Sequence, residues 1–364
     1  MKKVLILTAE FGKGHLSVAE HLKTALEATG KAKAKIIDFG KYASGPFTHS
    51  HKSYDTATKH LPKAYRFFFD VTNDKSALRT LGGMQLKMSE RKAMKLFKEE
   101  KPDIVVIAFG GWVYAASKLA KKANPKTKVV SLATDSMIIH RSWSMGDIDA
   151  FIVPDKDTAE TVVEDGLDPK LVEAIGYPVN PKLYDKNFDT KKFLTGFEFD
   201  TSKKTILLIP TLSNKDKTLH LIEKVQELNK FNLAVICGRD QELHKKLKPH
   251  QSDKNFHLVG WTDMMPEYML ASDIIITKAG GSTVQECIAA GKPLVINQVI
   301  PGQEQGNALY VEKNLLGLVA LTNSEVINAI TKIDNNYKQY KANLRNIHTP
   351  YAADKVAKYL LSLV

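Results

Sequence analysis

Short apolar runs alternate with amphipathic stretches along the whole 364-residue chain. Runs rich in β-branched residues predict buried parallel strands, and apolar positions spaced three or four apart predict the helices between them. We expect strands at 3–8, 35–39, 104–108, 128–133, 150–153, 172–175, 205–209, 233–237, 256–259, 274–277, 294–296 and 318–321. This alternation predicts an α/β fold of parallel sheets covered by helices.

The segment 178–204 interrupts the alternation, with two prolines and no sustained period. The chain is also longer than one hydrophobic core usually supports. We therefore expect two doubly wound, Rossmann-like domains facing a central cleft, with residues 1–180 in the first, 181–204 as a linker and 205–345 in the second. Ligands of such sheets bind beyond the carboxyl ends of the strands, so the cleft is the expected site.

The chain is basic, with a formal net charge of +12 and a pI of about 9.3. Residues 41–101 hold thirteen Lys and Arg against six Asp and Glu, a local net charge of +7. The same stretch contains three consecutive rings, Phe67, Phe68 and Phe69. Rings beside dispersed cations favour an anionic membrane surface as a partner. Alternatively, the rings belong to the core and the lysines to a solvated face.

Other partner classes and locations find less support in the sequence. No nucleic-acid-binding signature occurs, so nucleic acid is not an expected partner. Cys237 and Cys287 suggest neither a disulfide framework nor a metal site. No apolar run has the length of a membrane span or a signal peptide. We expect a protein in the cytoplasm, peripherally attached to the cell membrane.

The segment after the expected strand 274–277 has the pattern of a diphosphate site. Gly280 and Gly281 allow a sharp turn before a helix that opens at Ser282 and Thr283. Amide groups at a helix start favour a bound diphosphate. Glu286 lies one turn further on, where a carboxylate can accept hydrogen bonds from two ribose hydroxyls. Alternatively, Ser282 and Gln285 form an ordinary capping box.

A Gly- and Pro-rich loop follows, with side chains suited to binding sugar hydroxyls: Gln303, Glu304 and Asn307. Together these two segments resemble the donor half of the glycosyltransferase family that includes monogalactosyldiacylglycerol synthases, processive diacylglycerol glucosyltransferases and, more distantly, the peptidoglycan enzyme MurG. The resemblance implies the GT-B architecture and a UDP-sugar donor. It also implies that a C-terminal helix within 346–364 packs back toward the first domain.

The first strand-to-helix turn carries Glu10, Gly12, Gly14 and His15. It lacks the third glycine of a dinucleotide fingerprint, which argues against NAD. Transfer to a hydroxyl requires a base, and a positioned carboxylate or imidazole can act as one. In the family this loop ends in Gly-His with an acidic residue five positions earlier, the place of Glu10. Alternatively, His15 only caps the helix and Glu10 lies on the surface.

A second polar cluster follows the expected strand 128–133. Asp135, His140 and Trp143 resemble a family pattern that usually has proline after the histidine, where this chain has Arg141. The resemblance implies that Asp135 and His140 orient the acceptor or the donor sugar, and Trp143 is a candidate to stack on a sugar or touch lipid. A buried aspartate that caps a loop and a packed tryptophan would have the same sequence pattern.

Further donor contacts are expected from three loops of the second domain. Ser213 and Asn214 replace the glycine-rich loop that relatives place against the diphosphate. Arg239 is a candidate to neutralise the leaving diphosphate, or else forms a salt bridge at the rim. Val259 and Gly260 lie in a segment that resembles the one whose backbone holds the uracil edge in relatives.

Asp147 and Asp149 form an Asp-x-Asp motif, which binds a metal in a different glycosyltransferase fold. Here both precede an apolar strand of the expected acceptor domain, so we interpret them as strand-edge residues. We expect no metal and no cofactor, with the UDP leaving group stabilised by helix amides and side chains.

Taken together, these features predict an inverting, metal-independent glycosyltransferase that moves a hexose from a UDP-sugar to diacylglycerol. UDP-glucose is favoured as the donor and UDP-galactose is possible. Three alternatives remain open: transfer to a soluble acceptor, MurG-like transfer to a lipid-linked muropeptide, and a non-catalytic nucleotide-sugar sensor.

Overall fold

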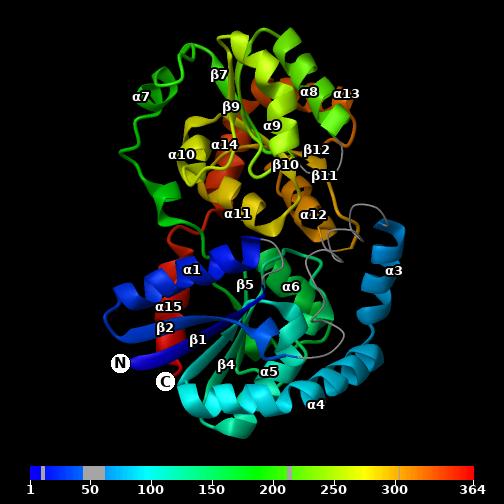
Figure 1. Cartoon of the computed structure of the whole chain (residues 1–364), viewed down its shortest axis with the longest axis vertical. Helices are drawn as coiled ribbons and strands as arrows, with labels where there is room; N and C mark the ends of the chain where they lie inside the picture. Colours follow the sequence, from blue (N-terminus) through cyan, green and yellow to red (C-terminus); the bar gives the residue numbers. More distant parts are fainter. Residues whose placement is uncertain (10–12, 44–61, 211–214, 303) are drawn as a thin grey trace. The chain divides into compact units, whose positions relative to one another are not determined.

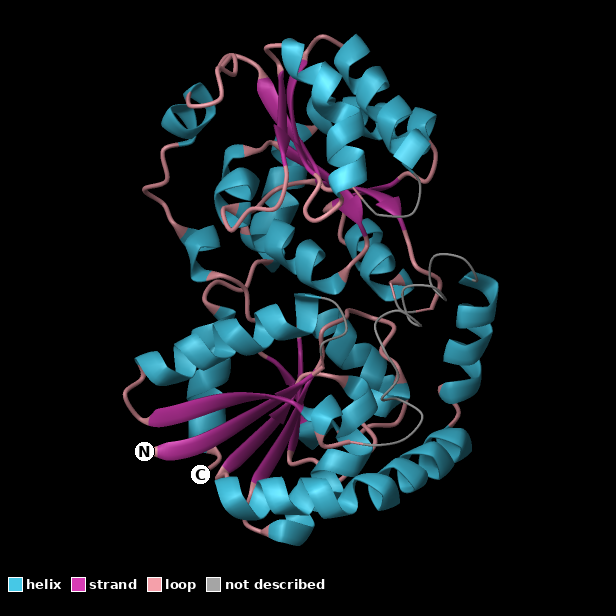
Figure 2. Ribbon diagram, in the orientation of Figure 1, coloured by secondary structure: helices cyan, strands magenta, loops and turns pink. Residues whose placement is uncertain are grey.

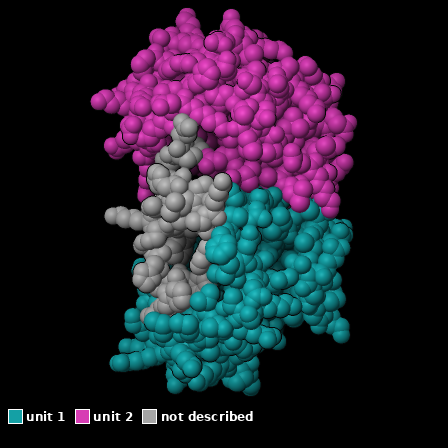
Figure 3. Space-filling model, turned by 90° about the vertical axis from the view of Figure 1, so that its right-hand side faces the viewer, with its two compact units in different colours: residues 1–179, 300–307, 351–364 teal, residues 180–299, 308–350 magenta. Residues whose placement is uncertain are grey.

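The computed structural model describes residues 1–9, 13–43, 62–210, 215–302 and 304–364. The chain forms two compact units, shown in two colours in Figure 3. Unit 1 comprises residues 1–179, 300–307 and 351–364, and unit 2 comprises residues 180–299 and 308–350. The chain therefore contributes the short segment 300–307 to unit 1 between two longer stretches of unit 2.

A parallel sheet with strand order β2-β1-β3-β4-β5-β6 forms the centre of unit 1. Its described strands are β1 (Lys2–Thr8), β2 (Ala32–Asp38), β3 (Ile104–Ile107), β4 (Lys128–Leu132), β5 (Ala150–Val153) and β6 (Val172–Ala174). β1, β3, β4 and β5 are buried on both faces, as the continuous apolar runs in the sequence predicted.

Helices cover both faces of this sheet (Figures 1 and 2). They are α1 (Lys13–Ala28), α4 (Lys75–Glu100), α5 (Gly110–Ala123), α6 (Lys156–Glu164) and α15 (Ala352–Ser362), with the 3₁₀ turns η1 (Phe39–Lys41), η2 (Arg141–Trp143) and η3 (Pro169–Leu171). The helix α3 (Pro62–Thr72) contacts α4 and stands away from the sheet (Figure 1). α4 packs along α5, and both join one core cluster with Leu5 and Leu7 of β1. The C-terminal helix α15 packs against α1.

Unit 2 contains a second parallel sheet with strand order β12-β11-β10-β7-β8-β9. Its described strands are β7 (Lys204–Leu208), β8 (Phe231–Ile236), β9 (Phe256–Val259), β10 (Ile274–Lys278), β11 (Leu294–Gln298) and β12 (Gly317–Val319). In both units the strands lie within a few residues of the predicted ranges. The prediction of two doubly wound α/β domains is confirmed.

The helices of unit 2 are α7 (Thr190–Thr195), α8 (Lys215–Glu227), α9 (Gln241–Leu247), α10 (Met265–Ala271), α11 (Gly281–Ala289), α12 (Gln305–Lys313), α13 (Asn323–Asn335) and α14 (Tyr337–Ile347), with the 3₁₀ turns η4 (Pro181–Tyr184) and η5 (Lys248–Ser252). α12 begins in the segment that belongs to unit 1. The interval 178–204 contains ordered structure, since η4 and α7 both pack against α10.

The helices that the structure describes contain no stretch with the length and apolar character needed to cross a bilayer.

Candidate active site of a glycosyltransferase

His15 lies in the first turn of α1, just beyond the carboxyl end of β1. Its ring centroid is 5.3 Å from that of Phe109 and 6.2 Å from that of Trp143. Burial lowers the pKa of His15 to about 4, although a backbone hydrogen bond at Ala108 opposes the shift. His15 is therefore a neutral imidazole at neutral pH. Gly14 is half-buried beside it, and Glu10 and Gly12 lie outside the described residues.

The loop after β4 is held by the start of α6. Asp155 caps α6 by accepting a hydrogen bond from the Thr158 amide at 2.7 Å, and its second oxygen accepts one from the Ser136 hydroxyl at 2.8 Å. The Thr158 hydroxyl accepts a hydrogen bond from the Met137 amide at 2.8 Å. These residues are not among the predicted site residues, although an aspartate at a strand end three residues before a threonine is a recognisable N-cap signal.

Asn307 connects segment 300–307 to the same loop. Its side-chain oxygen accepts a hydrogen bond from the Ser136 amide at 2.8 Å, and its nitrogen donates one to Asp135 at 3.0 Å. Asn307 is 0% exposed, so both ends of its amide are used inside the protein. The structure thus brings together the predicted residues Asp135 and Asn307, which lie 172 positions apart.

Glu304 stabilises its own loop, because its carboxylate accepts a hydrogen bond from the Ile300 amide at 3.0 Å while the residue is 3% exposed. Gln303 lies outside the described residues. The two described residues of this loop that are predicted to bind the donor, Glu304 and Asn307, are buried and form hydrogen bonds within the protein.

His140 links α3 to the loop after β4 through hydrogen bonds. Its Nδ1 accepts a hydrogen bond from the Ser142 amide at 3.2 Å, which places the ring proton on Nε2, 3.3 Å from the Thr72 hydroxyl. Thr72 in turn donates to the Phe69 carbonyl at 3.2 Å. Burial, and then the nearby charge of Arg141, lower the pKa of His140 to about 4. Both nitrogens of the neutral ring therefore have hydrogen-bond partners within the protein.

The aromatic residues predicted to touch membrane or acceptor occupy different environments. Trp143 is 5% exposed, and its ring packs among the buried apolar side chains of the unit 1 core. It is therefore not a surface residue. Phe69 is half-buried, with its ring centroid 4.8 Å from that of His140. Phe67 is 71% exposed. The side chain of Phe68 lies outside the described residues.

The start of α11 provides the expected diphosphate geometry in unit 2. β10 ends at Lys278, and Gly280 occupies the N-cap position of α11 without a side-chain cap. The predicted alternative, a capping box at Ser282, is therefore not formed. Gly281, Ser282 and Thr283 supply the first-turn amides, at the positive end of the helix dipole.

Glu286 lies one turn further along α11 and is half-buried. Burial raises the pKa of its carboxyl to about 7. A half-buried carboxyl with a pKa near neutrality, which forms no ion pair with the described residues, is typical of binding and catalytic sites.

The remaining predicted donor residues lie at strand ends of unit 2. Arg239 is exposed and follows Gly238, whose φ of 58° is left-handed. Val259 ends β9, and Gly260 follows it; both are half-buried. Ser213 and Asn214 lie outside the described residues.

Asp147 and Asp149 are engaged by lysines of α5. Lys118 donates to Asp147 at 2.9 Å, and Lys121 donates to Asp149 at 2.7 Å. Within the described ranges, no three His, Cys, Asp or Glu side chains come close enough together to hold a metal ion.

Comparison with known families identifies both halves of the chain. Residues 15–179 match the family Monogalactosyldiacylglycerol (MGDG) synthase, and residues 213–358 match the Glycosyltransferase family 28 C-terminal domain. The chain is a glycosyltransferase. The predicted resemblance to diacylglycerol glycosyltransferases is confirmed.

Similar proteins span the whole glycosyltransferase. Proteins named processive diacylglycerol beta-glucosyltransferase are 28% identical in Staphylococcus epidermidis, over 375 residues, and 27% identical in Staphylococcus aureus, over 374 residues. Each match covers 100% of this chain and 93% of the relative.

Solved structures share the fold at low sequence identity. Acinetobacter baumannii MurG has a TM-score of 0.62 at 16% identity, covering 100% of both chains. S. aureus MnaA, solved with UDP, has a TM-score of 0.61 at 13% identity, covering 100% of this chain and 98% of that one. These similarities show the GT-B type of fold.

Gly306 provides a test of how closely segment 300–307 approaches the loop after β4. A Cβ at this position would lie 2.1 Å from the Ser136 carbonyl oxygen and 2.5 Å from the Ile138 nitrogen. Gly306→Ala should therefore displace the loop and lower the free energy of unfolding by about 1–3 kcal/mol, the usual cost of overpacking. Urea-induced unfolding measures this loss.

The matched control is Gly83→Ala in α4, where a Cβ would meet nothing within 4 Å. It should be neutral or stabilising by about 0.5–1 kcal/mol, since alanine favours a helix. If the two variants unfolded alike, the contact between Gly306 and the loop would not be a tight one.

Proposed function

We propose that this glycosyltransferase transfers a hexose from a UDP-sugar to the free hydroxyl of diacylglycerol, with inversion at the anomeric carbon, to make a membrane glycolipid. The observation that carries the proposal is the match, over the full length of the chain, to proteins named processive diacylglycerol beta-glucosyltransferase. The synthase match in the first half of the chain supports the same acceptor. UDP-glucose is the favoured donor.

The donor is held by unit 2 in this proposal. The first-turn amides of α11 and the helix dipole favour the diphosphate, and Gly280 at the N-cap has no side chain to cap them. Glu286 accepts hydrogen bonds from the ribose hydroxyls, and Arg239 balances the negative charge of the departing UDP. Solved structures of similar fold include complexes with UDP and with UDP-glucose, which is consistent with this assignment.

The acceptor reacts near the first turn of α1. Its hydroxyl oxygen forms a bond to the anomeric carbon as the bond from that carbon to the diphosphate breaks, and a base takes the hydroxyl proton. A base works best with a pKa near the operating pH. Glu10 and His15 are the two candidates for this base. A His15 imidazole whose pKa is about 4 and an ordinary glutamate, whose pKa is roughly 4.3, are bases of similar strength, so position relative to the acceptor hydroxyl selects between them.

The membrane contact is assigned to the basic segment 41–101, within which α3 presents Phe67 at the surface. Cations near an anionic surface attract it, and an exposed ring can insert at the headgroup boundary. The protein would then be attached peripherally at the cytoplasmic face. No metal or cofactor takes part in the proposed reaction.

Product analysis tests the transfer itself. Incubation with diacylglycerol in vesicles and either UDP-glucose or UDP-galactose, followed by mass analysis of the lipids, should give hexosyl-diacylglycerol and UDP, with more product from UDP-glucose. The reaction should proceed in excess EDTA, since Asp147 and Asp149 are paired with lysines. Release of UDP without a glycolipid would argue for another acceptor, and activity that required added Mn²⁺ would contradict the metal-independent assignment.

The raised pKa of Glu286 makes donor binding depend on pH. Ribose hydroxyls donate best to the ionised carboxylate, and with a pKa of about 7 its ionised fraction rises from roughly one tenth at about pH 6 to nine tenths at about pH 8. Affinity for UDP-glucose should therefore increase over this interval, by up to about tenfold. Calorimetry at several pH values measures this change.

Glu286→Gln should bind more weakly at alkaline pH and show no such dependence, because an amide does not titrate in this range. Glu227→Gln, an exposed position of α8, is the matched control and should behave as the unaltered protein does. Equal pH dependence in the unaltered protein and in Glu286→Gln would remove Glu286 from the ribose site.

Phe67 tests the membrane contact. Phe67→Ser removes an exposed ring without changing charge, so it should reduce sedimentation with phosphatidylglycerol vesicles even at low salt. Added salt should weaken binding of the unaltered protein, since each cation near the surface contributes about 1 kcal/mol that salt screens. The control is Leu321→Ser, which removes a 50% exposed apolar side chain from unit 2. An equal loss in both variants would mean that insertion is not specific to α3.

A further inference from the structure

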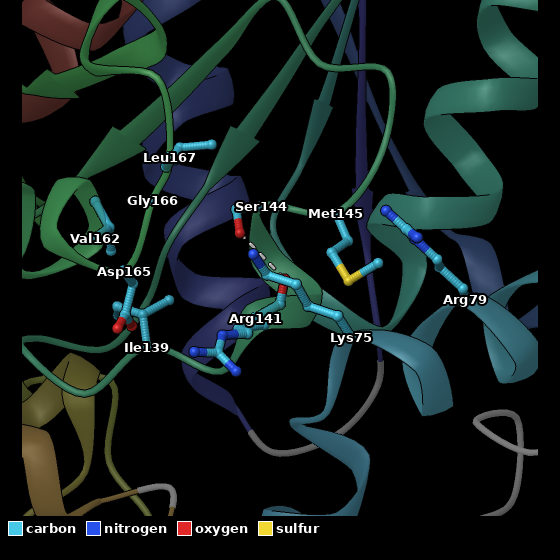
Figure 4. Close-up of a pocket in the computed structure, with 10 residues that line it drawn as sticks. All are labelled: Lys75, Arg79, Ile139, Arg141, Ser144, Met145, Val162, Asp165, Gly166 and Leu167. Carbon is cyan, nitrogen blue, oxygen red and sulfur yellow. Dashed lines mark hydrogen bonds between the residues drawn. The ribbon is translucent and has the colours of Figure 1, made fainter.

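A cavity of about 190 Å³ opens in unit 1, and its lining contains none of the predicted donor residues, although Ile139 and Arg141 flank His140 in the chain. Three segments line it: the first two turns of α4, residues 139–145 around η2, and residues 162–167 at the end of α6. Figure 4 shows the side chains of these segments around the cavity. Nothing in the proposed transfer reaction requires this cavity.

Three cations line the cavity. Lys75 and Arg79 lie one helical turn apart on α4, and Arg141 comes from η2. None of these three forms an ion pair with any residue that the structure describes. Other cations of unit 1 do form such pairs, as Lys118 does with Asp147 and Lys122 with Glu90.

The lining contains a single carboxylate, Asp165. Three positive charges against one negative charge leave an excess of two cations around a small volume. An excess of positive charge around a cavity favours a bound anion. Guanidinium groups also match the oxygen geometry of a phosphate, to which they can donate two parallel hydrogen bonds.

The rest of the wall is apolar, with Ile139 and Val162 buried and Met145 and Leu167 half-buried. The volume is below the roughly 300–1,000 Å³ typical of sites for drug-sized ligands. The ligand should therefore combine an anionic group with a short, uncharged body that packs against these side chains.

We propose that this cavity binds the phosphate group of a small phosphate ester. Lys75, Arg79 and Arg141 hold the phosphate oxygens, and the apolar wall contacts the carbon body of the ester. A soluble ester such as glycerol 3-phosphate and the headgroup of a glycerophospholipid share this chemistry. The site is separate from the donor site, so phosphate binding in this cavity does not depend on the proposed transfer reaction.

The first experiment measures binding of inorganic phosphate and of glycerol 3-phosphate to the full-length protein by calorimetry. Lys75→Gln with Arg79→Gln should weaken binding at least about tenfold, as expected when charge-assisted hydrogen bonds are lost. The matched control, Lys355→Gln with Lys358→Gln, removes the same charge from exposed positions of α15, outside both the cavity and the basic segment 41–101, and should bind as the unaltered protein does.

Asp165→Asn provides a gain-of-affinity test. Removing the single carboxylate of the lining should strengthen phosphate binding by roughly twofold to fivefold, the range for interactions between exposed charges. A structural role for Asp165 would not produce this gain.

The second experiment distinguishes the two sources of the phosphate. The same variants are sedimented with vesicles of phosphatidylcholine, with and without phosphatidylglycerol. If soluble esters bind and the Lys75/Arg79 variant loses them, the site accepts a free phosphate ester. If only phosphatidylglycerol vesicles reveal the difference between variant and control, the ligand is a lipid headgroup. If variant and control lose binding equally, or neither loses it, the cations are only part of a diffuse basic surface and the proposal fails.

Discussion

The side-chain amide of Asn307 is the contact on which the polar architecture of unit 1 depends. It accepts from the Ser136 amide and donates to the Asp135 carboxylate, and it is fully buried. A buried amide that lost one partner would leave an unsatisfied polar group, which costs about 1–3 kcal/mol. The loop after β4 and segment 300–307 therefore keep one arrangement, reinforced by the close approach at Gly306. From there, His140 extends the same network to α3.

Burial sets the protonation states around this network. His15 and His140 remain neutral at neutral pH because desolvation lowers the pKa of each to about 4. In unit 2 the same effect acts in the opposite direction on an acid and raises the pKa of Glu286 to about 7. Neutral imidazoles suit hydrogen bonding and orientation, whereas a carboxyl poised near neutrality changes state when a ligand binds. The two units thus place different chemistry at the ends of their sheets.

Charge is distributed unevenly over unit 1. Lysines of α5 neutralise Asp147 and Asp149, which accounts for the Asp-x-Asp motif as a set of ion pairs at the edge of β5. The cations at the start of α4 and in η2 instead surround a cavity. The cations of unit 1 are therefore of three kinds: some form ion pairs, some lie on the surface, and some line the cavity. Each kind has a different consequence for binding.

The sequence by itself determined the strands, because a buried parallel strand needs a continuous apolar run, and each predicted run became a strand. The sequence also predicted the turn between β10 and α11, because glycines at the end of a strand are a local signal for a sharp turn. Only the tertiary structure decided what the polar side chains do. The side chains of Asn307 and Glu304, which have sugar-binding residue types, form hydrogen bonds within the protein, and Trp143 lies in the core. Such roles depend on partners distant in sequence or on burial, and neither leaves a pattern in neighbouring residues.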